Sequence, residues 1–397
     1  MRVTQSLNAT QFLSALDTLE SKLSQTQNQI STGLAFTTAA QNPVAAGSVD
    51  SYDQALATSQ QYTTNANGAQ SSLNVEDNAM TQVQSQLQTL RDLALQANSG
   101  TVSNQNLSAI ATQASQIQST LLSLANTQDG NGGYIFAGYA TQTQPFAATA
   151  TGASYGGDQG QRQVQIAAGQ TVAVGDNGDA VFNQIKTGNG TFTVSAAPAN
   201  TGTGLIGAST VTDAANYDGG TYSIAFGAGG TYQVLDVHNA VVTSGTYTAG
   251  QSIGFRGVQV TISGQPASGD SFTVAPSTSQ SLFTTVQNLV STLRAGTTGA
   301  NGQTGLANSL SGSINNLDQA LTQASTVQSG IGSRLNTITT QLSLASSQQI
   351  QLQQSISNLQ SLDYPSAITT LDNENTTLSA AMQAYTLTQG LTLFKYL

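Results

Sequence analysis

The stretch QFLSALDTLESKLSQTQNQIST, residues 11–32, determines how the chain is interpreted, because its apolar residues recur at intervals of three and four. A repeat of about 3.5 residues keeps one stripe of a helix turned toward a partner helix. The stripe consists of Phe12, Leu16, Leu19, Leu23 and Ile30, with Thr26 at the remaining step. We predict a helix from residue 1 to about residue 34, and it has no partner beside it in sequence.

The stretch AITTLDNENTTLSAAMQAY, residues 367–385, carries the same spacing near the other end. Its stripe consists of Ile368, Leu371, Leu378, Met382 and Tyr385. Two such stripes indicate that the ends pair with each other or with other copies of the chain. Burying so few side chains does not offset the entropy of ordering about 30 residues, and an isolated helix of that length is marginal. We therefore predict that the ends order when copies assemble.

The composition is unusual in its lack of charge. Only 7% of the 397 residues are charged, and nine basic against nineteen acidic residues give a net charge of −10. Ordinary domains have about 25% charged residues. A neutral polar surface favours close packing between copies of the chain. The absence of a basic cluster argues against nucleic acid as a partner.

Several function classes are excluded or disfavoured by missing features. The chain has no cysteine, which excludes disulfides, thiolate catalysis and cysteine-bound zinc. No stretch reaches the 18 or so continuous apolar residues of a membrane helix, so we expect no membrane insertion. The first 30 residues hold no charged-then-apolar signal peptide, so we expect any export to proceed without cleavage. We also predict no cofactor.

The region between the ends changes character twice. Residues 43–130 read as long helices, in which Leu73, Met80 and Leu87 recur at seven-residue intervals and Glu76 interrupts the stripe. Residues 131–280 are rich in Gly, Thr, Val and Tyr in alternating runs, which is typical of antiparallel strands. Helical periodicity resumes at Ser281 and ends at Tyr364-Pro365.

We therefore predict an α+β multidomain protein. Its N- and C-terminal regions form a long coiled-coil-like helical bundle, and an antiparallel β domain is inserted between them. The predicted segments are an N-terminal assembly helix (1–42), two bundle halves (43–130 and 281–364), an outward β-rich domain (131–280) and a C-terminal assembly helix (365–397).

The search for catalytic, cofactor or metal sites gives weak candidates only. The single histidine, His238, follows Asp236 and precedes Ser244, but no nucleophile elbow accompanies them, so we expect a surface histidine in a strand that enters a hairpin turn. Residues 202–207 match G-x-G-x-x-G without the flanking strand and helix of a dinucleotide site, so we expect a loop. Asp176 and Asp179 lack calcium-loop spacing, so we expect a β-turn.

Several segments together resemble the flagellin superfamily, and within it most closely the family that joins the flagellar hook to the filament. The resemblance covers about residues 1–146 and 280–397 and is carried by the following segments: Met1-Arg2-Val3, Gln29 to Gly33, Asn42 to Ala46, Leu124 to Thr127, Asp129 to Tyr139, Pro145-Phe146, and the end from Tyr385 to Phe394. Two departures stand out. The superfamily's usual Asp-Asp-Pro is Gln41-Asn42-Pro43 here, and residues 183–275 do not align with short members.

The resemblance implies a non-enzymatic structural protein outside the cell, in the flagellum, exported through the flagellar type III channel. It implies the following partners: copies of the chain in a ring layer, hook-associated protein 1, flagellin and a flagellar export chaperone. Residues matching the assembly segments are Phe12, Leu16, Leu19, Leu23, Ile30, Ile368, Leu371, Leu378, Met382, Tyr385, Leu391 and Phe394.

Other functions stay open at this point. The same fold serves a flagellin filament subunit, which differs in copy number. A secreted adhesin with a ligand-binding β domain is a second alternative, and a cell-wall enzyme built on His238 is a more distant one.

Overall fold

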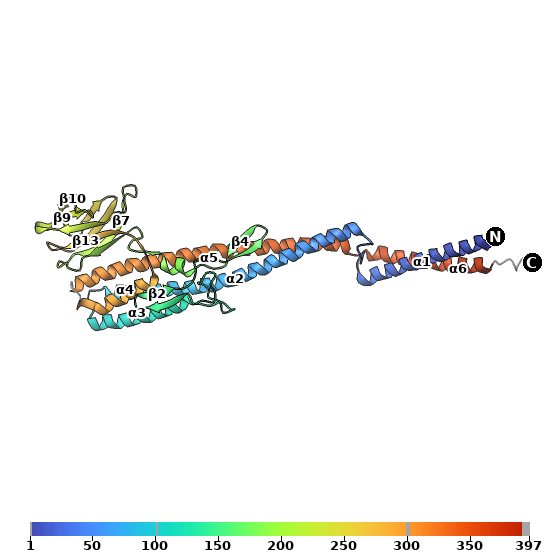
Figure 1. Cartoon of the computed structure of the whole chain (residues 1–397), viewed down its shortest axis with the longest axis horizontal. Coiled ribbons are helices and arrows are strands. Elements are labelled where there is room, and N and C mark those ends of the chain that lie inside the picture. The colour runs from blue at the N-terminus through green and yellow to red at the C-terminus, as the bar shows by residue number, and fades with distance from the viewer. Residues whose placement is uncertain (1, 101, 299–301, 391–397) are drawn as a thin grey trace, which may run out of the picture. The chain divides into compact units, whose positions relative to one another are not determined.

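The computed structural model of the chain describes residues 2–100, 102–298 and 302–390. Its helices and strands confirm the predicted α+β fold (Figure 1). The α-helices of the described residues are α1 (Arg2–Thr32), α2 (Pro43–Ala97), α3 (Asn104–Ala125), α4 (Leu282–Ala295), α5 (Gly302–Gln360) and α6 (Tyr364–Gly390).

All strands of the described residues lie between α3 and α4. They are β1 (Phe146–Thr149), β2 (Gly152–Tyr155), β3 (Gln163–Ala167), β4 (Gln170–Ala173), β5 (Ile185–Lys186), β6 (Phe192–Ala196), β7 (Leu205–Val211), β8 (Tyr222–Phe226), β9 (Thr231–Leu235), β10 (Val241–Thr246), β11 (Ser252–Phe255), β12 (Val258–Ser263), β13 (Ser271–Pro276) and β14 (Ser279–Gln280). A short π-helix, Asp179–Asn183, precedes β5.

The chain divides into two compact units. One consists of residues 1–64 and 341–397, and the other of residues 65–340. The five segments predicted from the sequence have other boundaries than these two units, and they remain a proposal.

The second unit contains a frame of helices. The predicted stripe of α2 is buried, with Leu73, Met80 and Leu87 at most 1% exposed. Helix α3 packs against α4. Each of these two begins with a serine cap, because the Ser103 hydroxyl accepts the backbone N–H of Asn106 and the Ser281 hydroxyl accepts that of Phe283. The N-terminal and C-terminal halves of the chain thus share one core.

An aromatic cluster fixes the first part of the inserted region onto that frame. Phe146 lies 5.1 Å from Phe283 of α4 and 5.5 Å from Phe182, measured between ring centroids. Phe136 meets Phe182 edge to face at 5.1 Å. Such tilted and edge-to-face pairs are favourable beyond their buried area. Residues 136–182 therefore belong with the helices rather than with the outer strands.

The outer strands form a β-sandwich. One sheet has the order β10-β9-β8-β13-β6 and the other the order β11-β12-β7, with antiparallel pairing throughout. Alternate residues point into the shared core, as the buried Tyr222, Ile224 and Phe226 of β8 illustrate. This alternation is the pattern that predicted the strands.

The sandwich leaves the frame and returns to it through a narrow neck. Strands β5 and β14 pair antiparallel, with Lys186 opposite Ser279 and Ile185 opposite Gln280. The backbone N–H of Thr187 donates to the Thr278 carbonyl over 3.0 Å, and the Thr187 hydroxyl accepts the Thr278 N–H over 3.0 Å. Entry and exit are thus adjacent, as expected of an inserted module.

Candidate assembly interface

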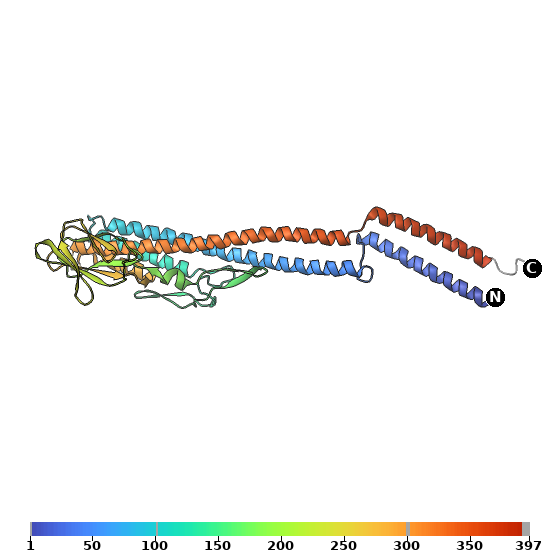
Figure 2. The same cartoon turned by 90° about the horizontal axis from the view of Figure 1, so that it is seen from above.

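Helices α1 and α6 lie side by side, and the two perpendicular views agree (Figures 1 and 2). The rings of Phe12 and Tyr385 stack with centroids 5.1 Å apart and planes 12° apart. Further along α1, Leu16, Leu19 and Leu23 are half-buried, and Thr26 is fully buried. The stripe predicted for the N-terminal helix is therefore the face that α1 turns toward α6.

The register of α6 differs from the predicted one. Its less exposed positions are Ala367, Leu371, Glu374, Leu378, Ala381 and Tyr385. Ile368 and Met382 are each 49% exposed, so neither lies in the seam between the two helices. The predicted stripe and the observed one share Leu371, Leu378 and Tyr385. The other two predicted residues, Ile368 and Met382, each directly follow an alanine that does face the seam.

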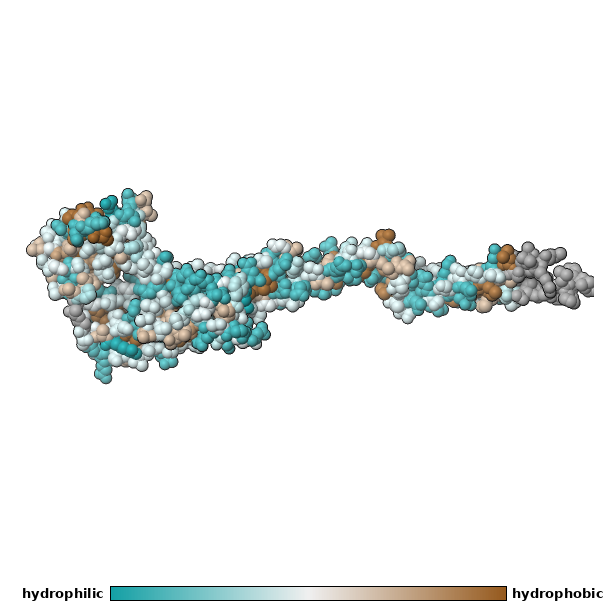
Figure 3. All heavy atoms as spheres, viewed as in Figure 1, coloured by the Kyte–Doolittle hydropathy of each residue, from teal (hydrophilic) through white to brown (hydrophobic). Residues whose placement is uncertain are grey.

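The outer faces of this helix pair expose apolar side chains. Leu7 is 59% exposed, Leu13 47% and Leu387 71%, in addition to Ile368 and Met382. In Figure 3, brown apolar atoms reach the surface along these helices among neutral and polar ones. Exposed apolar groups on a helix pair with a thin seam are typical of a surface that packs against further chains. Leu391 and Phe394, also predicted as assembly residues, lie outside the described residues.

A compact corner connects the terminal helices to the longer ones. Gly33 has φ +72°, a conformation that glycine adopts without strain, and a Cβ placed there would lie 2.9 Å from the hydroxyl oxygen of Tyr364. The N–H of Ala35 donates to the Gln360 carbonyl over 2.7 Å, and that of Leu362 donates to the Gly33 carbonyl over 3.0 Å. These hydrogen bonds join the segment that follows α1 to the segment that connects α5 with α6.

A small apolar cluster completes the corner. Phe36, Ala45 and Val49 are buried and pack against Ile356 and Leu359 of α5. On the adjoining turn, the Asn42 side chain accepts the N–H of Ala45 over 3.1 Å. Asn42 thus caps α2 without the negative charge of the superfamily's usual aspartate.

The residues considered for catalysis have structural roles. His238 is exposed as predicted, but it lies in the turn between β9 and β10 rather than in a strand. The Asp236 carboxylate accepts the backbone N–H groups of His238 and Ala240 over 2.8 and 2.9 Å, so it caps that turn. The hydrogen bonds from the N–H groups of Ala240 and His238 lower the pKa of Asp236 below its ordinary value.

The other two motifs also differ from a functional site. The G-x-G-x-x-G match is a loop only as far as Gly204, because residues 205–207 begin strand β7. The β-turn predicted at Asp176 and Asp179 is wrong, since residues 174–177 form no turn and Asp179 begins the π-helix. Asp176 instead forms an ion pair with Arg334. Within the described ranges, no three His, Cys, Asp or Glu side chains gather closely enough to hold a metal ion.

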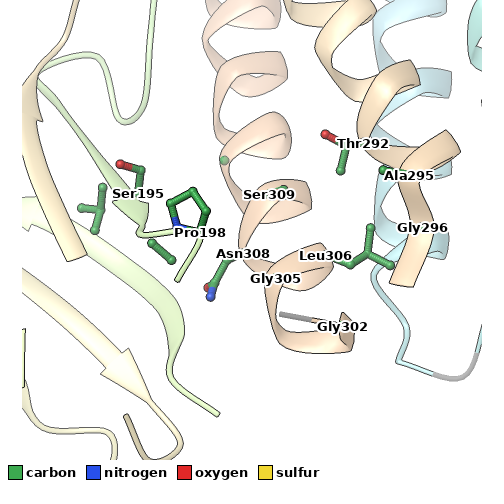
Figure 4. Close-up of a pocket in the computed structure, with 13 residues that line it drawn as sticks. Ser195, Pro198, Thr292, Ala295, Gly296, Gly302, Gly305, Leu306, Asn308 and Ser309 are labelled. Carbon is green, nitrogen blue, oxygen red and sulfur yellow. The ribbon is translucent and has the colours of Figure 1, made fainter. Parts of the chain in front are cut away.

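The sandwich contacts helix α5 through polar side chains. Asn308 accepts the N–H of Ile206 over 2.8 Å and donates to the Gly204 carbonyl over 3.0 Å. Figure 4 shows Asn308 reaching from α5 toward the strands, beside a cavity of about 350 Å³ that Pro198 and Leu306 also line. Asn316 accepts the N–H of Gly188 over 2.7 Å. The sandwich is thus attached by a few hydrogen bonds next to open space.

Three features were not predicted from the sequence. Glu374 lies in the α6 stripe, where a carboxylate is not expected, and one of its oxygens is buried without a hydrogen-bond partner. Ala367 and Ala381 could have been found, since they keep a 3.5-residue spacing, although alanine is a weak apolar signal. Glu76 is buried with partners about 100 residues away, and no local pattern indicates them.

Comparison with known proteins identifies two matched regions. Residues 3–141 match the family described as the bacterial flagellin N-terminal helical region. Residues 195–276 match the family described as the D2-like domain of flagellar hook-associated protein 1. The second match coincides with the sandwich, the part that did not align with short members of the superfamily. In the described part of the chain, no helix has the length and apolarity needed to cross a membrane.

Individual relatives agree with these matches. Flagellar hook-associated protein 3 of Salmonella typhimurium is 32% identical over 185 residues, which is 47% of this chain and 58% of the relative. The crystal structure of FlgL from Xanthomonas campestris is 34% identical with a TM-score of 0.72, covering 77% of this chain and 99% of that one. The flagellar junction protein FlgL of Legionella pneumophila is 28% identical with a TM-score of 0.70, covering 77% of this chain and all of that one. The match thus spans little more than half the length of the curated relative.

Proposed function

Because this chain belongs to the flagellin superfamily and, within it, to the hook-associated protein 3 (FlgL) family, we propose that it is the structural junction between the flagellar hook region and the filament. The observation that supports this most is the likeness to FlgL over 99% of the solved Xanthomonas chain at 34% identity.

We infer that the partners are hook-associated protein 1 on one side and flagellin on the other, with copies of the chain forming a ring layer between them. Helix pairs with exposed apolar residues suit this role, because each copy can offer one face to its own seam and another to a neighbour. Export through the flagellar channel, with help from a chaperone and without cleavage, would place the protein outside the cell.

The assembly residues are proposed on both faces of the terminal pair. Phe12, Leu16, Leu19, Leu23, Leu371, Leu378 and Tyr385 hold α1 to α6, while Ile368 and Met382 project outward to a neighbour. The seam residues are only half-buried in a single chain. Burial in the assembly supplies the remaining apolar contact, and this supports the proposal that the ends order as copies come together.

The sandwich is proposed to be an accessory outer module rather than part of the assembly interface. It joins the frame through the β5–β14 neck and a few hydrogen bonds to α5. Its resemblance to a domain of hook-associated protein 1 favours a structural role over the binding of a host ligand.

Counting copies on isolated flagella tests this proposal. A tagged version of the protein should label a single short layer at the hook end of the filament. Labelling along the whole filament would show a flagellin subunit instead, and labelling absent from flagella would overturn the assignment.

A further inference from the structure

Glu76 is a buried carboxyl in the apolar stripe of α2. Its side chain is 1% exposed, and Leu73 and Met80, three before it and four after it, are each 0% exposed. Burying an ionised carboxylate among such neighbours is costly unless it is fully paired. A carboxyl at this position therefore needs compensation from groups elsewhere in the fold.

The compensation comes from a loop and from a second helix. Glu76 Oε1 accepts the backbone N–H of Asp176 over 3.0 Å. The Asp176 carboxylate pairs with the Arg334 guanidinium of α5 and accepts the Gln161 side-chain amide over 2.7 Å. Arg334 also contacts the carbonyls of Gly330 and Ala173. Loop 174–178, between β4 and the π-helix, is thereby held between α2 and α5.

One atom of this arrangement has no partner. Glu76 Oε2 is buried and accepts no hydrogen bond. The charged groups that act on Glu76 are Asp176 and Arg334. The adjacent Asp77 of α2 instead accepts a hydrogen bond from the side-chain amide of Gln328 in α5. Two ionised carboxylates facing one guanidinium leave a net buried charge of −1. A single proton on Glu76 removes that charge and gives the cluster a net charge of zero.

The pKa of Glu76 agrees with this count of charges. Burial first, and then the neighbouring Asp176 carboxylate, raise the pKa of Glu76 to about 8, although Arg334 and the Asp176 N–H act in the opposite direction. The ordinary pKa of this group is 4.5. Between these two values the folded chain holds a proton that the opened chain releases, so its stability falls as the pH rises through this window.

We propose that Glu76, Asp176 and Arg334 form a pH-sensitive latch, in which a proton on Glu76 fastens loop 174–178 to α2 and α5 and its loss to solvent as the pH rises releases the loop. The latch lies entirely in the unit formed by residues 65–340. It is independent of the terminal helices, and its test requires no assembly.

Hydrogen exchange followed by mass spectrometry on the full chain tests the latch. After correction for the intrinsic pH dependence of exchange, opening of peptides covering residues 174–178 should increase about tenfold per pH unit between about pH 5 and pH 8. Glu76→Gln, which keeps the shape of the protonated side chain, should flatten this dependence to within about twofold over the same range. Asp92→Asn is the matched control, because it removes an exposed carboxylate from the same helix and should leave the wild-type slope.

An unchanged slope in Glu76→Gln, or a flat profile in the wild type, would overturn the proposal. Infrared spectroscopy of the wild-type protein gives a second measurement, which does not depend on how the variant folds. A protonated carboxyl band should be present at neutral pH and disappear above about pH 8. Its absence at neutral pH would exclude a bound proton and with it the latch.

Discussion

The ring of Phe12 lies flat on the ring of Tyr385, 5.1 Å away and tilted by only 12°. These residues belong to helices from opposite ends of the chain, α1 and α6, which pack side by side. From this contact, Leu16, Leu19 and Leu23 of α1 follow in order along the same seam.

Truncating Tyr385 should loosen the terminal helices. Tyr385→Ala removes the stacked ring, and such pairs are worth about 0.5–1.5 kcal/mol beyond their buried area. Limited proteolysis of the assembled protein should therefore trim both ends faster than in the wild type. Tyr385→Phe keeps the ring and should behave like the wild type, whereas equal trimming of all three proteins would rule out a stabilising role for the stack.

The two registers of α6 predict different effects of polar substitutions. Ile368→Gln and Met382→Gln alter exposed positions, so the free energy of unfolding of the single chain should change by no more than about 0.5 kcal/mol. Assembly, followed by light scattering, should nevertheless weaken because an outward contact is lost. Leu378→Gln alters the seam and should lower both stability and assembly. Normal assembly of both outward variants would remove Ile368 and Met382 from the interface.

Gly33 should not tolerate a side chain. Gly33→Ala forces φ +72° on alanine and places a Cβ 2.9 Å from the Tyr364 hydroxyl oxygen, so we expect a loss of about 1 kcal/mol or more. Gly47 of α2 has open space around it, and Gly47→Ala should stabilise the helix by up to about 1 kcal/mol. Chemical denaturation compares the two variants. Similar effects in both would show that the corner imposes no constraint.

The sandwich should be removable at its neck. Replacing residues 188–277 with Asn-Gly joins the paired Thr187 and Thr278 through a two-residue hairpin turn. The helical frame should keep its circular dichroism signal, and cells carrying this version should still grow filaments. Loss of filaments with a folded frame would show that the sandwich is needed for assembly.

A deletion of residues 183–275, the region that the sequence left unaligned, provides the contrast. It removes strand β5 together with Ile185, which is 3% exposed in the frame. We expect this version to unfold or aggregate, since it removes a buried side chain and one strand of the neck. If it folds as well as the neck deletion, the boundary between frame and sandwich is drawn in the wrong place.

Sequence periodicity predicts the helices well because their apolar residues are large and regularly spaced. The α1 stripe from Phe12 to Ile30 coincides with the less exposed positions of that helix. The α6 stripe differs from the observed seam at Ile368 and Met382, because Leu371, Leu378 and Tyr385 fit two neighbouring registers. Size alone then favours Ile368 and Met382 over Ala367 and Ala381. Which of the two registers is buried depends on how α6 packs against α1.

Long-range polar contacts could not be predicted in the same way. Glu76 reads as an interruption of an apolar stripe, and Asp176 reads as a turn residue. Glu76 accepts the Asp176 N–H directly and Asp176 pairs with Arg334, so three segments that are far apart in the chain meet. Local patterns carry no information on such a contact, whereas the alternation in β8 and β12 reports burial directly and gave the correct strands.

Deleting the gene that encodes this protein and examining the flagella by electron microscopy tests the junction role most directly. We predict hooks without filaments, with unpolymerised flagellin released into the medium, and recovery when the wild-type chain is restored. Filaments of normal number and length in the deletion strain would contradict the account.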